Sequence, residues 1–208
     1  MKFSPRLMGV LAAGLVGASS QLGAQAQVRF AGATYGCFYD VPATSCTPTT
    51  TASDFFLTFT QGTFNALTSP TGFLGLGGTT NNLGSMALTA STASYTGKFL
   101  LEVLFSLPTL TPSNAVYTAA VLGDVYQGDG GVNISFSSPQ TFAFNGPDYN
   151  GTFTLSVNNI SINPNNSPQV VSGFITTSVA PEPGTTALFA TGLVGLIPMV
   201  RIKRRKLG

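Results

Sequence analysis

The sequence predicts an all-β fold for residues 27–180, an antiparallel β-sandwich of the jelly-roll or immunoglobulin-like kind. Three observations lead to this fold class. Apolar and polar residues alternate in several short segments, which is the pattern of strands with one buried face. Clusters of Gly, Asn, Asp, Ser and Pro separate these segments, as they do in sandwiches. No part of this region has a convincing helical period.

The clearest predicted strand covers residues 98–107. Its odd positions, from Phe99 to Leu107, are all apolar, whereas Lys98 and Glu102 lie at even positions. Since side chains alternate between the two faces of a strand, we expect the odd positions to be buried in one layer. Glu102 is expected on the opposite face, in contact with water.

Further strands follow from the same alternation. Phe55, Leu57 and Phe59 form one set, and the remaining sets lie at residues 132–136, 142–144, 152–157 and 170–178. The last two are expected to form a hairpin, residues 152–162 against residues 169–178. Within it, Asn158 and Asn159 shift the alternation, which either a β-bulge or a tight two-residue turn would explain. The Gly-rich residues 72–82 are expected to be a long loop.

The N-terminal residues 1–26 have the organisation of a secretory signal peptide. Lys2 and Arg6 precede a short apolar region, residues 7–16. Ala24 and Ala26 then provide the small residues of a cleavage site. We therefore expect an exported domain at residues 27–180.

The C-terminal residues 181–208 contain three features in order. Pro181-Glu182-Pro183 comes first, and an apolar stretch at about 184–200 follows. This stretch approaches the roughly 20 residues of a membrane-spanning helix if Arg201 reaches back to the headgroups. The tail, residues 201–208, is basic and is expected to stay cytoplasmic; its cationic residues are Arg201, Lys203, Arg204, Arg205 and Lys206.

This order of box, apolar helix and basic end resembles the PEP-CTERM sorting signal of Gram-negative bacterial exoproteins. The resemblance implies that an exosortase recognises the segment and cuts it near Pro181, Glu182 and Pro183. It also implies a transient stay in the inner membrane, followed by release to the cell surface or to the extracellular matrix, where exopolysaccharide is a possible partner in a biofilm. An ordinary C-terminal anchor with stop-transfer charges would use the same apolar and basic residues.

The composition of the expected domain excludes nucleic acid as a partner. Its only basic residues are Arg29 and Lys98, and it has six acidic residues, so its net charge is −4. Nucleic-acid binding needs clustered Lys and Arg. Cys37 and Cys46 are expected to form a disulfide, because an exported protein meets an oxidising compartment. The chain has no histidine to complete a zinc site with them.

Candidate catalytic residues are few. Without histidine, Ser-His-Asp and Cys-His triads are excluded. A Ser–Lys dyad would have to use Lys98, which is better explained as part of a solvated strand face. Paired carboxylates for glycan hydrolysis remain formally possible, although turn chemistry explains most of these residues; they are Asp54, Glu102, Asp124, Asp129 and Asp148.

The best binding candidate is a calcium site formed by Asp124 and Asp129, together with Asp148. No other cofactor is expected. Exposed tyrosines near these loops would favour a carbohydrate- or calcium-binding adhesion module; the candidates are Tyr117, Tyr126 and Tyr149. The function that we expect first is a non-enzymatic exported surface or matrix protein. The adhesion module and a carboxylate-based glycan hydrolase are the alternatives.

Overall fold

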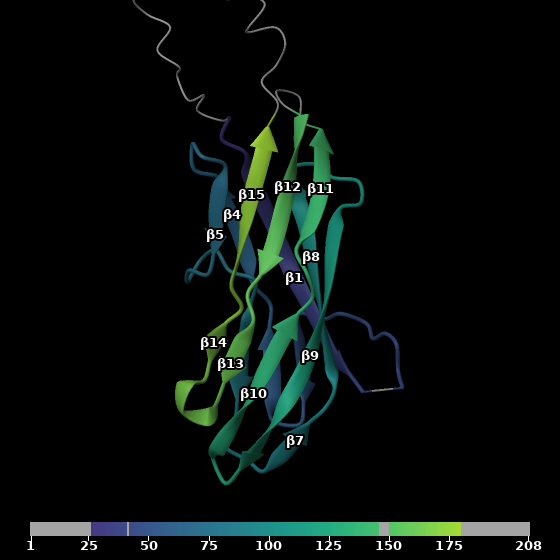
Figure 1. Ribbon diagram of the computed structural model, residues 1–208, viewed down its shortest axis with the longest axis vertical. Helices are drawn as coiled ribbons and strands as arrows, with labels where there is room; N and C mark the ends of the chain where they lie inside the picture. Colours follow the sequence, from purple (N-terminus) through teal and green to yellow (C-terminus); the bar gives the residue numbers. More distant parts are fainter. Residues whose placement is uncertain (1–25, 41, 146–149, 180–208) are drawn as a thin grey trace, which may run out of the picture.

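The computed structural model describes residues 26–40, 42–145 and 150–179, and in them the chain is all-β (Figure 1). Every strand pairing in these residues is antiparallel. A short 3-10 turn, η1 (Pro164–Asn166), is their one helical element. The prediction of an all-β, antiparallel fold is therefore confirmed.

The strands form three sheets, named here by their place in Figure 1. The long sheet contains, in spatial order, β13 (Ile160–Ile162), β10 (Asp129–Phe136), β9 (Asn114–Tyr126), β8 (Lys98–Leu107), β1 (Arg29–Tyr39) and β4 (Thr63–Leu67), with β7 (Ala93–Tyr95) beside β9. The upper sheet contains β11 (Gln140–Asn145), β12 (Asn150–Val157), β15 (Gly173–Val179) and β5 (Phe73–Leu76). The lower sheet contains β14 (Gln169–Val170), β6 (Ser85–Leu88), β3 (Leu57–Thr60) and β2 (Thr51–Asp54).

The two smaller sheets cover different parts of the long sheet, which gives a sandwich-like arrangement around one core. Phe30 of the long sheet meets Phe153 of the upper sheet, with ring centroids 4.9 Å apart. Phe99 of the long sheet meets Phe59 of the lower sheet, with centroids 5.1 Å apart. All four rings belong to one cluster of buried residues. Aromatic contacts of this kind, within a core that also contains many Leu, Val and Ile side chains, help to hold the three sheets together.

Strand β8 confirms the predicted register over most of its length. Phe99, Leu101, Val103 and Phe105 are buried, as the alternation predicts. Leu107 was expected on the same face, but it is 44% exposed. The pairing with β1 shifts between Ala31 and Gly32, so Ser106 has no partner and Leu107 leaves the inward row. A β-bulge of this kind re-aims the side chains that follow it.

The strands beside β8 carry small residues opposite its large ones. Gly36 of β1 is the partner of Leu101, and Ala119 of β9 is the partner of Phe99. A Cβ atom on Gly36 would lie 2.6 Å from Cζ of Phe99, so a side chain there cannot be accommodated without displacing that ring. At these positions the large side chains of β8 fill the core, and the small residues of β1 and β9 leave the space for them.

Two other expectations about strands are wrong. Phe55 does not point inward with Leu57 and Phe59; it lies in the turn between β2 and β3 and is 71% exposed. The Gly-rich residues 72–82 are not one loop, because they include β5, which pairs with β15. Leu74 and Leu76 of β5 are buried, and two such residues in a four-residue strand suffice to dock it on the core.

The expected C-terminal hairpin forms only in part. β12 pairs with β15, but β13 pairs with β10 and β14 pairs with β6. Between β12 and β13 there is neither a bulge nor a hairpin turn: at Asn158 and Asn159 the chain leaves the upper sheet and joins the long sheet. The Asn159 side-chain oxygen accepts a hydrogen bond of 2.9 Å from the Phe136 backbone N–H, which fixes the crossing point.

Both ends of the described chain lie at the same end of the body. β1 starts and β15 finishes at the top of Figure 1, whereas the turn between β9 and β10 lies at the bottom. The expected cleavage residue Ala24, the Pro181-Glu182-Pro183 box and the basic tail lie outside the described residues. So does the expected span at about 184–200; among the residues that the structure does describe, no helix has the length and apolarity needed to cross a bilayer.

Candidate functional site

Three connections meet at the end of the body farthest from the chain termini, and together they are called the distal tip. They are the β2–β3 turn with Phe55 and Phe56, the β6–β7 loop (residues 89–92) and the β9–β10 turn with Tyr126 to Asp129. The Thr89 backbone N–H donates to the Phe56 carbonyl at 3.0 Å. The Gln127 backbone N–H donates to the Thr92 hydroxyl at 3.2 Å. The β6–β7 loop is thus hydrogen-bonded to both turns and holds them next to each other.

The β9–β10 turn has two central residues, Gln127 and Gly128. Both have positive φ, 50° and 92°, which is the pattern of a type I′ hairpin turn. Asp129 pairs directly with Tyr126 and already belongs to β10. The glycine-rich residues 128–131 indicate a turn here, but the observed turn lies earlier, at Gln127 and Gly128, and residues 129–131 already belong to β10.

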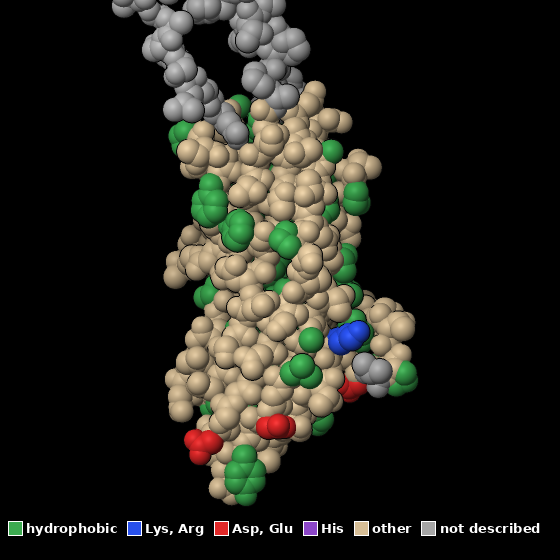
Figure 2. Space-filling view, in the orientation of Figure 1, with side chains coloured by type: hydrophobic (Ala, Val, Ile, Leu, Met, Phe, Trp, Pro, Cys, Tyr) green, Lys and Arg blue, Asp and Glu red, His purple; other side chains and the backbone are tan. Residues whose placement is uncertain are grey.

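The register of the hairpin gathers Asp124, Tyr126 and Asp129 on one exposed face. Asp129 is opposite Tyr126, and opposite residues of an antiparallel pair point the same way. Asp124 precedes Tyr126 by two positions and therefore shares its face. Diagonal neighbours of this kind lie about 7–8 Å apart. Tyr126 is 65% exposed and is a neighbour of both carboxylates on this face; Figure 2 shows acidic side chains near an exposed hydrophobic one at this end.

A fourth side chain, Ser94 of β7, completes this face. It is the register partner of Asp124, and its hydroxyl donates to the Asp124 Oδ1 atom at 2.5 Å. This contact orients the carboxylate. Sequence reasoning missed Ser94, because only the pairing of β7 with β9 brings residues 94 and 124 together.

The expected calcium triad is brought together in part. Asp124 and Asp129 share a face, whereas Asp148 lies outside the described residues. The strands on either side of Asp148, β11 and β12, meet at the upper end of Figure 1, opposite the distal tip. Calcium takes about six to eight oxygen ligands. Within the described part of the chain, no group of three or more acidic, His or Cys side chains could hold a metal ion.

Among the predicted aromatic residues, Tyr126 is exposed and Tyr117 is not. Tyr117 is fully buried, and its hydroxyl donates to the Leu155 carbonyl at 2.6 Å. Burial raises the pKa of Tyr117 far above its ordinary value. The tyrosine therefore closes the interface between the long sheet and the upper sheet and offers no surface for a ligand. Tyr149 lies outside the described residues.

Sequence reasoning also missed the aromatic pair Phe55 and Phe56. The Phe55 ring meets the ring of Tyr95 edge-on, with centroids 6.1 Å apart. The Phe56 backbone N–H donates to the Tyr95 hydroxyl at 3.3 Å. Phe55 has a φ of 50°, a conformation that bulky residues rarely adopt. The signal in the sequence was the run Phe55-Phe56-Leu57, in which adjacent apolar residues break the period of two.

The charged side chains described at and near the distal tip are carboxylates. Burial raises the pKa of Asp54, and the nearby charge of Asp40 raises it further. The pKa of Tyr95 is raised chiefly by burial, with a smaller contribution from Asp54, whereas its hydrogen bond with Phe56 acts in the opposite direction. Tyr95 therefore stays neutral to a higher pH than an exposed tyrosine.

Glu102 and Lys98 lie elsewhere, on β8. The Glu102 Oε1 atom accepts a hydrogen bond of 2.7 Å from the Asn114 side-chain amide. Glu102 is half-buried between Tyr35 and Val116 in the long sheet, so it is less exposed than the alternation suggested. The register separates it from the pair of carboxylates at the distal tip.

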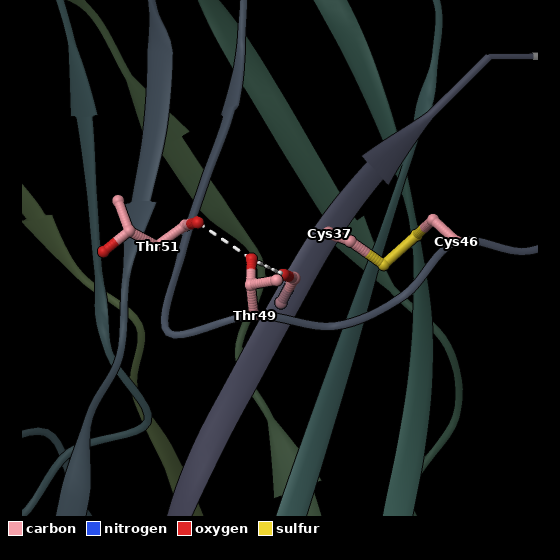
Figure 3. Close-up of a disulfide and its surroundings, with 5 residues drawn as sticks. Cys37, Cys46, Thr49 and Thr51 are labelled. Atoms are coloured by element: carbon pink, nitrogen blue, oxygen red, sulfur yellow. Dashed lines mark hydrogen bonds between the residues drawn. A yellow bond between two sulfur atoms is a disulfide. The ribbon is translucent and has the colours of Figure 1, made fainter.

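The predicted disulfide between Cys37 and Cys46 is present (Figure 3). It joins β1 to the loop that follows it, with Cα atoms 6.1 Å apart. Gly36 and Thr49 close the same loop, each backbone N–H donating to the carbonyl of the other at 2.9 Å. The Thr49 hydroxyl also donates to the Thr51 carbonyl at 2.8 Å. The disulfide and this bridge together fix the path from β1 to β2.

Comparison of the chain with protein-family models, with curated proteins and with solved structures found no match in any of the three.

Proposed function

We propose that the protein is a non-enzymatic exported protein of the cell surface or extracellular matrix, sorted by an exosortase. One observation supports this proposal above the others: β1 begins and β15 ends at one end of the body, and the distal tip lies at the other. A domain held through its C-terminal segment would therefore present the distal tip away from the membrane.

In this proposal the two ends of the chain serve export. The signal peptide, residues 1–26, is removed next to Ala26, and the segment at about 184–200 crosses the inner membrane transiently. An exosortase then cuts near Pro181-Glu182-Pro183, and exopolysaccharide is the partner outside the cell. A net charge of −4 on residues 27–180 is consistent with the lack of a nucleic-acid partner. The finer assignment to a jelly-roll or immunoglobulin-like topology stays a prediction.

The sorting step is tested in a Gram-negative cell that makes an exosortase. The variant carries alanine at Pro181, Glu182 and Pro183, and the matched control carries alanine at three exposed loop residues, Ser137, Ser138 and Pro139. The control and the wild-type chain should leave the cell with a C-terminus near the box, as read by mass spectrometry. The box variant should stay in the inner membrane with its tail intact. Extracellular protein that still ends in residues 201–208 would contradict the proposal.

A second candidate function is a carbohydrate- or calcium-binding adhesion module. The observation that favours it is the exposed ring of Tyr126 next to the carboxylates of Asp124 and Asp129. A sugar ring can stack on the tyrosine while its hydroxyls donate to the carboxylates.

The adhesion module is tested on a sugar array, with calcium or with a chelator. The variant Tyr126→Ala should lose binding, whereas Leu122→Ala on the same face of β9 should keep it. Equal binding by both variants would exclude the distal tip. Loss of wild-type binding in chelator would identify calcium as part of the site.

A further inference from the structure

We propose that the outer face of the upper sheet binds an extended, uncharged polysaccharide chain. This inference deepens the proposed association with exopolysaccharide and rests on it for the origin of the polymer. The surface is separate from the distal tip: it is formed by β11, β12, β15 and β5, and it is the face toward the viewer in the upper half of Figure 1.

The register of the four strands builds a row of hydroxyl groups across this face. Thr141 of β11 pairs with Thr154 of β12, which pairs with Thr176 of β15. Thr176 in turn pairs with Phe73 of β5. The three hydroxyls therefore span two strand spacings, about 10 Å, and the Phe73 ring continues the row onto the fourth strand. Next to it, Thr152 pairs with Ser178, which adds two more hydroxyls.

These hydroxyls suit a ligand that is itself rich in hydroxyls. The Thr141 and Thr154 hydroxyls lie 2.8 Å apart and share a hydrogen bond. A hydroxyl group has one donor and two acceptor positions, so each member of this pair keeps bonding capacity toward a ligand. Sugar hydroxyls can both donate and accept, and they match such a row without any charged group.

One edge of the face carries an aromatic platform. The rings of Phe73 and Phe174 are stacked, with centroids 5.8 Å apart and an interplanar angle of 25°. Phe73 is 48% exposed. The register partner of Phe174 is Gly75, which has no side chain to cover the rings. The apolar face of a sugar ring can stack on such a platform and remove its surface from water.

Charge indicates which kind of polymer fits. The four strands of the upper sheet contain no Asp, Glu, Lys or Arg. In Figure 2 the charged side chains seen in this view all lie in the lower half. A polyuronate or sulfated polymer would lose water from its charges here without gaining a countercharge. A neutral polysaccharide has no such penalty, and the acidic distal tip differs from this face in that respect.

Gly75 allows a test that leaves the core intact. A Cβ atom added there would have Phe73 Cε1 as its nearest neighbour, at the ordinary contact distance of 3.7 Å, and its φ is not in the positive region. Gly75→Gln should therefore fold normally while its side chain lies over the platform. Gly78→Gln is the matched control. Gly78 lies in the loop after β5, and a Cβ atom there would meet only the Asn81 carbonyl oxygen of the same loop, at 4.0 Å.

The experiment is co-sedimentation of the purified full chain, in a non-ionic detergent, with cellulose and with cross-linked dextran beads. Carboxymethylated forms of both polymers serve as the charged probes. We expect binding to at least one neutral polymer and clearly weaker binding to its carboxymethyl form. Gly75→Gln and Phe73→Ala should each weaken this binding about tenfold, the loss of one good stacking contact. Gly78→Gln and added chelator should leave it unchanged.

Several results would overturn the inference. They are no binding to either neutral polymer, equal binding by Gly75→Gln and Gly78→Gln, or loss of binding with Tyr126→Ala or chelator, which would place the site at the distal tip. Self-association of the wild-type chain that Phe73→Ala abolishes would identify a second copy as the occupant. The assay needs no sorting step, so a negative result here and a negative result for the Pro181-Glu182-Pro183 variant are distinguishable.

Discussion

Replacing Phe105 with alanine should remove a large part of the stability of the domain. Phe105 is 6% exposed, and its ring packs against Phe30, Phe64, Phe142 and Phe153 at centroid distances of 5.2–6.4 Å. These rings come from both the long sheet and the upper sheet, so a cavity here loosens the contact between them. A Phe→Ala change in such a core costs about 3–5 kcal/mol, against a total of about 5–15 kcal/mol for an ordinary domain.

The matched controls are Leu104→Ala and Glu102→Gln on the same strand. Leu104 is next to Phe105 but points outward and is 41% exposed, so its loss should cost about 1 kcal/mol. Glu102→Gln keeps the oxygen that accepts from Asn114 and should stay within about 0.5 kcal/mol. Guanidinium melts followed by circular dichroism give the three free energies of unfolding. Equal losses for Phe105→Ala and Leu104→Ala would refute the assigned register of β8.

Three further predictions concern the disulfide, Tyr117 and Gly36. Cys37 and Cys46 should show no free thiol before reduction, and serine at both should lower stability by about 3 kcal/mol at most; two titratable thiols in native protein would refute the bond. Since burial raises the pKa of Tyr117, the stability it contributes is present below its ordinary pKa of about 10 and is lost as pH rises toward the folded value. Melts at pH 9 and pH 11 should therefore show a smaller alkaline loss for Tyr117→Phe than for wild type; equal losses would contradict this. Gly36→Ala should cost about 1–3 kcal/mol through overpacking against Phe99, and an unchanged melt would show that this ring can move aside.

The strands that could be predicted are those whose inward residues are large. β8, β10 and β12 each place Phe, Leu, Val or Ile at alternate positions, and the alternation located all three. β1 and β9 were missed, although they flank β8 at the centre of the long sheet. Their inward residues opposite β8 include Gly36 and Ala119, which are small because Phe99 and Leu101 occupy the shared space. The sequence of β1 or β9 alone therefore lacks the large alternating residues by which a buried strand is recognised, because the side chains that fill the space belong to β8.

The distal tip was predicted in part. Asp124 and Asp129 were placed in one candidate site, and the structure puts them on one face, but the hairpin that does so was not predicted, because β9 was missed. Phe55 and Ser94 were missed, since their places depend on pairings between segments distant in sequence. Tyr117 was expected at the surface, but its place on β9 alternates with the exposed Val116 and points it inward.

The strand exchange at Asn158 and Asn159 could not be predicted either. The sequence shows a shift in alternation there, and a shift is also what a bulge or a turn would produce. Only the partners of the flanking strands, β15 for β12 and β10 for β13, distinguish the three explanations. Local pattern reports which side of a strand is apolar but not which sheet the strand joins.

The position of β15 determines how the domain would respond to mechanical force. β15 is the last described strand, and it is hydrogen-bonded on both sides, to β12 and to β5. It runs toward the upper end of the body, so a pull on its C-terminal end is directed along the strand axis. Both ladders are then loaded in shear, and their hydrogen bonds must break together instead of opening one after another. An object attached at the distal tip and a tether attached after Val179 would pull on the domain in this resistant direction.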